Sequence, residues 1–108
     1  MAAMTTARAK FSVGQLVHHK RFGYRGVVID VDPRFQGTEE WYETMARSKP
    51  PKDKPWYHVL VDGGERETYV AERNLDPDET GRPIDHPLVP KFFVALGDGG
   101  YIPRRKGN

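Results

Sequence analysis

The stretch Gly23–Pro33, which reads GYRGVVIDVDP, decides the fold. A turn flanked by glycines leads into a run of β-branched residues, and an Asp-Pro pair ends that run. The two-residue period of a strand places three apolar side chains on one face, namely Val27, Ile29 and Val31. It places a mostly polar set on the other face, namely Val28, Asp30 and Asp32. The stretch therefore predicts a strand over Tyr24–Val31 that buries one face.

The stretch Pro55–Gly64, which reads PWYHVLVDGG, is the expected partner of this strand. Its Trp56–Val61 part has the composition of a strand, and the Asp62–Gly64 turn that follows predicts a hairpin. Further short strands are expected in three places, namely Leu16–His19, Glu67–Ala71 and Tyr101–Pro103. Together these runs predict a mainly β chain, in which about five antiparallel strands form a small twisted barrel with aromatic residues at its rim.

One helix is expected near residues 38–48, between the two central strands. Thr38 can cap it, and Glu39 and Glu40 fall in the first turn, where the helix dipole favours acidic side chains. The proline-rich segment Ser48–Pro55 cannot continue the helix and is expected to be an exposed loop. The whole chain is therefore expected to divide into a flexible arm, a single domain with a C-terminal extension from residue 76, and a basic tail, namely residues 1–10, 11–103 and 104–108.

The composition fits one domain with a small core. Hydrophobic residues make up 37% of the 108 residues, which is lean for a self-sufficient core, so association with copies of itself stays an open alternative. The absence of cysteine excludes disulfides and thiolate metal sites, and it fits a cytoplasmic protein. The N-terminus has no apolar signal region and no run approaches the length of a transmembrane span, so no membrane partner is expected.

Three blocks of sequence occur in order: FSVGQLVHH with GYRGVVIDVDP in residues 11–33, PWYHVLV in residues 55–61, and TYVAERNL in residues 68–75. Their conjunction resembles the HspQ/YccV-like family of hemimethylated-DNA-binding proteins. The resemblance implies an SH3-like barrel with a helix inserted between its second and third strands, and a role that is not enzymatic. It also implies two kinds of partner: hemimethylated DNA, or an ATP-dependent protease and its client proteins, for which heat-shock and stress-response relatives act as adaptors or specificity factors.

Charge is distributed unevenly along the chain. Residues 1–25 contain five Lys or Arg and no acid, whereas residues 62–79 contain seven acids and two Arg. Lysine and arginine beside aromatic rings can neutralise phosphates while a ring contacts the bases. The candidate DNA-binding residues lie in and near the first turn, namely Lys10, His19, Lys20, Arg21, Tyr24 and Arg25. The net charge of only +2 leaves the alternative open that these are ordinary solvated charges.

Aromatic residues provide the second candidate surface. The chain has 12 of them, more than so small a barrel is expected to bury completely. Those considered for protein interaction are Trp41, Trp56, Tyr57, Phe92 and Phe93. The acidic 62–67 hairpin is expected to belong to the same surface in an adaptor. Burial of the rings in the core is the competing interpretation.

No catalytic site, metal site or cofactor is expected. One of the adjacent His18 and His19 could join His58 with Asp30 or Asp62 as metal ligands, but hydrogen bonds between strands explain these side chains without a metal. The Asp30–Asp32 spacing resembles that of the carboxylate pair of glycosidases, yet Asp32 precedes a proline, which is typical of a turn. The sequence therefore favours a binding module over an enzyme.

Overall fold

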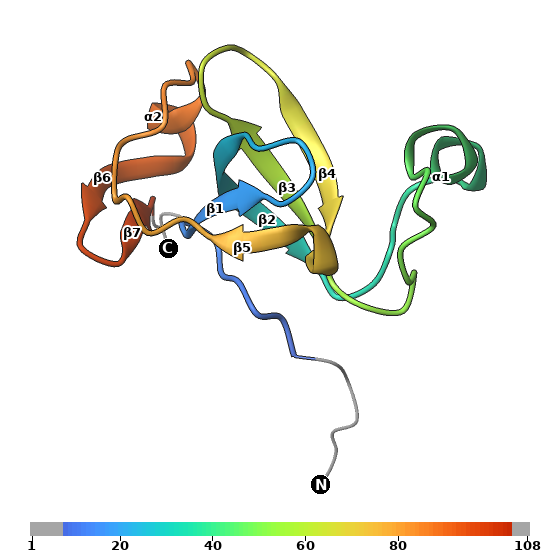
Figure 1. Ribbon diagram of the computed structural model, residues 1–108. Coiled ribbons are helices and arrows are strands. Elements are labelled where there is room, and N and C mark those ends of the chain that lie inside the picture. The colour runs from blue at the N-terminus through green and yellow to red at the C-terminus, as the bar shows by residue number, and fades with distance from the viewer. Residues whose placement is uncertain (1–7, 105–108) are drawn as a thin grey trace, which may run out of the picture.

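A five-stranded antiparallel sheet forms the centre of the protein (Figure 1). The computed structural model describes residues 8–104. The strand order is β4-β3-β2-β1-β5, so β4 and β5 form the two edges. The strands are β1 (Leu16–His19), β2 (Arg25–Asp32), β3 (Trp56–Val61), β4 (Glu67–Ala71) and β5 (Leu75–Pro77). The prediction of a mainly β fold with about five antiparallel strands is confirmed, while closure of the sheet into a barrel stays a prediction.

The C-terminal part of the chain forms a separate two-stranded sheet. After the four-residue helix α2 (Val89–Phe92), the strands β6 (Phe93–Gly97) and β7 (Gly100–Pro103) pair antiparallel. The strand predicted at the end of the chain is therefore present, but it does not belong to the central sheet. The fifth strand of that sheet is β5, which has only three residues and ends in proline, and so carries little of the pattern that predicts a strand.

A β-bulge in β2 decides which side chains face which side of the sheet. Val28 pairs with Val59 of β3, but the next pair is Asp30 with His58, so Ile29 is an extra residue. The bulge reverses the alternation beyond it, and Val31 packs with Val28 against one core cluster, while Ile29 packs against another. The prediction that Val31 shares a face with Val27 and Ile29 was therefore wrong.

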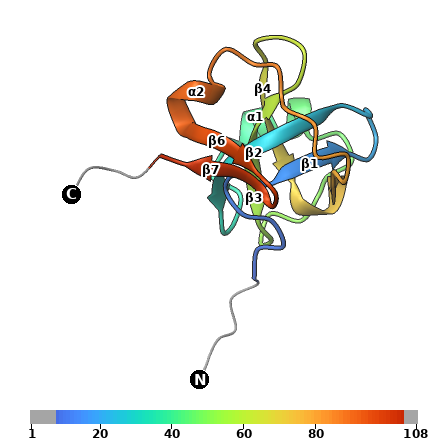
Figure 2. The ribbon, with the colours of Figure 1, turned by 90° about the vertical axis from the view of Figure 1, so that its left-hand side faces the viewer.

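Both faces of the central strands are covered. One cluster lies between the strands of the sheet and the N-terminal segment, and comprises Phe11, Val17, Val28, Tyr57, Val59, Val70 and Leu75. The other lies beneath the C-terminal extension, and comprises Leu16, Val27, Leu60, Ile84, Phe93 and Tyr101. Figure 2 shows the β6–β7 hairpin lying over this second face. The extension from residue 76 thus packs on this face of the sheet, where Val27 and Leu60 are fully buried.

The insertion between β2 and β3 carries the helix α1 (Glu39–Met45), which stands beside the sheet (Figure 1). The Thr38 side chain accepts a hydrogen bond from the Trp41 backbone N–H at 3.0 Å, as predicted for the cap. The helix is shorter than expected and ends at Met45. The loop after it folds back on the helix, because the Tyr42 hydroxyl donates to the Pro50 carbonyl at 2.6 Å and Lys49 adopts a left-handed backbone with φ of 53°.

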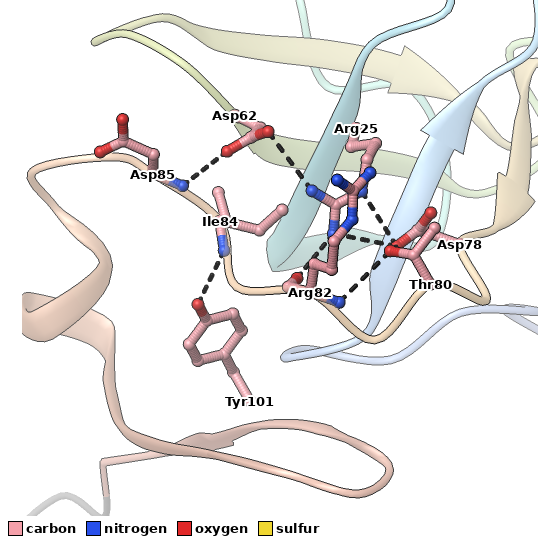
Figure 3. A network of polar contacts seen from close by, with 8 residues as sticks. All are labelled: Arg25, Asp62, Asp78, Thr80, Arg82, Ile84, Asp85 and Tyr101. Carbon is pink, nitrogen blue, oxygen red and sulfur yellow. Dashed lines mark hydrogen bonds and ion pairs between the residues drawn. The ribbon is translucent and has the colours of Figure 1, made fainter.

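A network around Arg25 fastens the chain after β5 to the sheet (Figure 3). The guanidinium donates to Asp78 Oδ2 from Nε at 3.1 Å and from Nη2 at 3.0 Å, and to Asp62 Oδ2 from Nη1 at 3.3 Å. It also donates to the Arg82 carbonyl at 2.6 Å. The side chains of Arg25 and Asp78 are only 13% and 6% exposed, so this ion pair lies inside the protein.

Two predicted regions lie mostly outside the described residues. Of the expected arm 1–10 the structure describes residues 8–10, and of the basic tail 104–108 it describes Arg104. Among the helices of the described part, none is long and apolar enough to span a membrane.

The Arg25 network predicts a specific loss of stability in acid. Burial favours the neutral form of Asp78, but hydrogen bonds from Arg25 and Thr80 outweigh it and lower the pKa of Asp78 below its usual value. Stability from this carboxylate is present above the pKa of the unfolded chain, about 4, and is lost as the pH falls through the lower folded-state pKa. Denaturant unfolding between pH 6 and about pH 3 should show a smaller acid loss in Asp78→Asn than in the parent.

Arg25→Ala should cost roughly 2–4 kcal/mol at neutral pH, because it leaves the Asp78 carboxylate buried without its partner. Lys91→Ala, which removes an exposed cation on α2, is the matched control and should change stability by less than about 0.5 kcal/mol. Equal acid sensitivity of the parent and Asp78→Asn would contradict this account of the network.

Candidate functional site

A groove of about 810 Å³ runs along the edge strand β4. The turn between β1 and β2 forms one wall with Arg21 and Phe22, and the end of α1 forms the other with Trp41 and Met45. The strand β4 itself forms the floor. The groove thus joins the first turn, which the sequence predicted to contact DNA, with Trp41 from the aromatic set considered for protein contacts.

The wall at the first turn is held by hydrogen bonds and ring contacts, and it presents an exposed ring. His19 is buried, and its Nδ1 accepts hydrogen bonds from the backbone N–H groups of Arg21 and Phe22, both at 3.1 Å. The Phe22 ring stacks on the imidazole with 4.7 Å between ring centres, yet it remains 74% exposed. Tyr24 lies 5.0 Å from the same imidazole, and its hydroxyl hydrogen-bonds Thr68 Oγ1 at 2.7 Å, which ties the turn to β4.

The charged side chains that line the groove give it a positive character. Arg21, Arg47 and Arg66 line it against one acid, Glu67. All three arginines are exposed, and within residues 8–104 none of them forms an ion pair. Arg66 lies over the Tyr24 ring, with 5.7 Å from the guanidinium carbon to the ring centre. The groove can therefore attract an anionic partner and offer it aromatic surface.

The structure separates the predicted DNA-binding residues. Arg21, His19 and Tyr24 line the groove, although His19 is buried and Tyr24 half-buried. Lys20 is exposed and lies 3.7 Å from Asp76 as a surface ion pair. Arg25 is held in the network with Asp62 and Asp78 and is not among the groove residues.

Lys10 also lies away from the groove lining, and its backbone N–H donates to Glu72 Oε2 at 2.8 Å. Of the six predicted residues, three therefore line the groove and three do not.

The aromatic set needs a correction. Trp56, Tyr57 and Phe93 are 1%, 0% and 2% exposed, and they belong to three different core clusters. Trp56 packs with side chains of the insertion, and Tyr57 packs with Val31 and the N-terminal segment. Phe93 packs from the C-terminal extension onto the central sheet. A partner therefore cannot touch these three rings in this conformation. Trp41 is half-buried in the groove wall, and Phe92 is half-buried beside the second cluster.

Several groove residues were not singled out as site residues. Phe22 had a visible signal, since it is an apolar ring within the polar run HKRFGYR. Arg66 reaches the groove because it follows the hairpin turn into β4, and Met45 and Arg47 reach it because the insertion folds beside the sheet. The last three had no signal in the sequence, because their positions depend on tertiary packing.

The chain matches the model of a known protein family. A family model described as hemimethylated DNA-binding protein YccV like matches residues 9–100. The match thus includes the sheet, the insertion with α1 and most of the C-terminal hairpin.

The structure of the first turn predicts a pH dependence near neutrality. Burial, together with the charges of Arg21 and His18, lowers the pKa of His19 below 6.5. Below about pH 6.5 the unfolded chain binds a proton at His19, whereas the folded chain does not until the pH reaches the lower folded-state pKa. The free energy of unfolding therefore falls as the pH drops toward that pKa. Unfolding at pH 7, 6 and 5 should show a smaller loss in His19→Asn, whose amide oxygen can replace Nδ1 as acceptor. His18→Asn is the control and should keep most of the loss, because burial of His19 and the charge of Arg21 are larger causes of the lowered pKa than His18.

Proposed function

This chain belongs to the YccV-like family of hemimethylated DNA-binding proteins, and we propose that it is a binding module that contacts DNA through the groove beside β4. The resemblance seen in the sequence and the family match support the partner. The observation that carries the choice of surface is the exposed Phe22 ring, which stacks on His19 in the groove that Arg21 and Arg66 also line. Within residues 8–104 neither arginine forms an ion pair.

Each part of this surface has a role in the proposed contact. Arg21, Arg47 and Arg66 neutralise phosphates, which supplies affinity that depends on salt but not on sequence. Phe22 contributes an apolar face that stacks on a base or wedges into a groove of the duplex. Lys20, next to Arg21 and exposed, adds a further positive charge. The preference for a hemimethylated duplex comes from the family description and is not assigned to any side chain.

The fold that we propose for the module is an SH3-like barrel that binds its partner and performs no reaction. Two features support this. The sheet order β4-β3-β2-β1-β5 places the first strand between the second and the last, and a 3₁₀-helix (Glu72–Asn74) turns the chain from β4 into β5. Such barrels expose an edge and the ends of their strands to partners.

DNA binding should depend on the arginines and on Phe22 in different ways. Three phosphate contacts predict a slope of log affinity against log salt of about −3, and Arg21→Ala or Arg66→Ala should each reduce its magnitude by about 1. Phe22→Ala should weaken binding by about tenfold and leave the slope unchanged. The measurement is fluorescence anisotropy with hemimethylated and unmodified duplexes at several salt concentrations.

Lys91→Ala is the control for this experiment, since it removes an exposed cation from α2, outside the groove. If the Arg21→Ala/Arg66→Ala double variant binds duplex as well as the parent at low salt, the assignment of the surface is wrong. Equal curves for the two duplexes would restrict the proposal to DNA in general.

A second candidate function, that of a protein adaptor, is favoured by the open edge of β4. On either side of β4, the Arg66 backbone carbonyl accepts a hydrogen bond from the Val61 N–H, and the Glu72 backbone N–H donates one to the Pro55 carbonyl. In this register, alternate residues of β4 bond to β3. The backbone groups of Glu67, Tyr69 and Ala71 consequently point away from β3, into the groove. An extended segment of a client protein or of an ATP-dependent protease could add to this edge as a further strand.

Blocking the edge separates the two candidate functions. Glu67→Pro removes the outward N–H while Arg66 and Thr68 keep their bonds to β3, and Glu67→Gln is the matched control that keeps the N–H. If the protein is an adaptor, pull-downs with ATP-dependent protease complexes should recover partners with the parent and Glu67→Gln, and not with Glu67→Pro. DNA binding should be the same in both variants. Failure of the parent to recover any partner would exclude the adaptor role.

A further inference from the structure

Two carboxylates and an imidazole converge on the face of the sheet beyond the β2 bulge. The bulge at Ile29 sets Asp30 directly opposite His58 of β3, and Asp32 follows on the same face. Each of the three side chains offers one ligand atom, and these atoms lie within 4.8 Å of one another. Without the extra residue, Asp30 would be on the face of Val28, which is buried in the core.

Carboxylates lie at both nitrogens of the His58 ring and orient it. Its Nδ1 lies 3.6 Å from Glu67 Oε2, and its Nε2 lies 3.2 Å from Asp32 Oδ2. A carboxylate behind the second nitrogen is the usual arrangement of a metal-binding histidine, because it holds the proton on that nitrogen and leaves the other lone pair for the metal. The ring also lies against Tyr69, with 4.5 Å between the ring centres.

The two carboxylates are also held in place. Asp32 Oδ2 accepts a hydrogen bond from the Tyr69 hydroxyl at 2.6 Å, and Asp30 Oδ1 accepts one from the Val31 backbone N–H at 2.9 Å. The ligand atoms are therefore positioned by the protein before any ion arrives.

The negative charge of this cluster is not balanced by the surrounding cations. Asp30, Asp32 and Glu67 gather around one imidazole, and among residues 8–104 no Lys or Arg forms an ion pair with any of them. Close carboxylates without a counter-charge repel one another, and a bound cation removes that repulsion. Asp30 is exposed and the other two ligands are half-buried, so an ion can enter from solvent.

We propose that Asp30, Asp32 and His58 form a binding site for one divalent transition-metal ion of the Zn²⁺ class. One nitrogen and two carboxylate oxygens suit such an ion, with water completing its coordination, whereas Mg²⁺ and Ca²⁺ prefer oxygen ligands alone. Binding places the imidazole proton on Nδ1, beside Glu67, and the Nε2 lone pair on the metal. The site does not depend on the proposed DNA contact.

Calorimetric titration of the full chain with ZnCl₂ tests the proposal. The parent should bind about one Zn²⁺ per chain, and Asp30→Asn and His58→Gln should each weaken the binding at least about tenfold. His18→Gln is the matched control, because His18 is a half-buried histidine on β1 outside the cluster, and it should bind as the parent does. Co²⁺ should give a visible absorption band in the parent that is lost in His58→Gln.

The decisive variant is Asp30→Asn, because Asp30 is exposed and its substitution leaves the core intact. Thermal unfolding without metal, equal for this variant and the parent, establishes that the fold is kept. The proposal is overturned if the parent shows no saturable Zn²⁺ binding, if Asp30→Asn binds as tightly as the parent, or if His18→Gln loses the ion as well. Equal affinity for Mg²⁺ and Zn²⁺ would exclude the imidazole as a ligand.

Discussion

The pairing of β2 with β3, interrupted once at Ile29, is the constraint on which the rest of the structure depends. Before the bulge the pair buries Val27 and Leu60 under the C-terminal extension, and Val28 and Val59 under the N-terminal segment. Beyond the bulge the same two strands carry polar side chains on one face. One extra residue therefore divides the sheet into a part that is core on both sides and a part that is free for polar chemistry.

The elements that could be predicted from the sequence are those specified by local patterns. The four longer strands of the central sheet and the Thr38 cap follow from alternation, turn residues and capping chemistry, all of which act between neighbours in the chain. The strand β5 and the role of the C-terminal hairpin could not be predicted in this way. A three-residue strand has no period, and the partners of Phe93 and Tyr101 lie far away in the sequence, on β1, β2 and β3.

In the candidate site, too, local sequence patterns predict some residues and miss those that depend on tertiary packing. The basic run with its aromatic rings predicts a contact surface at the first turn, and Arg21 does line the groove. The sequence could not show that Arg21 is available to a partner and Arg25 is not. Arg25 forms ion pairs with Asp62 and Asp78, which are far from it in the sequence. Burial likewise divides the aromatic residues: Phe22 is exposed in a turn, whereas Trp56 and Tyr57 are buried on the two faces of the central strand β3. The sequence shows which charged and aromatic residues the chain contains, and tertiary packing determines which of them are exposed to a partner.

The late position of the hairpin in the chain has a consequence for how the protein forms during its synthesis. Val27 and Leu60 are covered by Phe93 and Tyr101, which follow both of them in the chain. A nascent chain can pair β2 with β3 early, but one side of that pair stays in contact with water until β6 and β7 have also been made. The second core cluster therefore forms later than the central strand pair, and chaperones would meet the chain with this apolar surface still exposed.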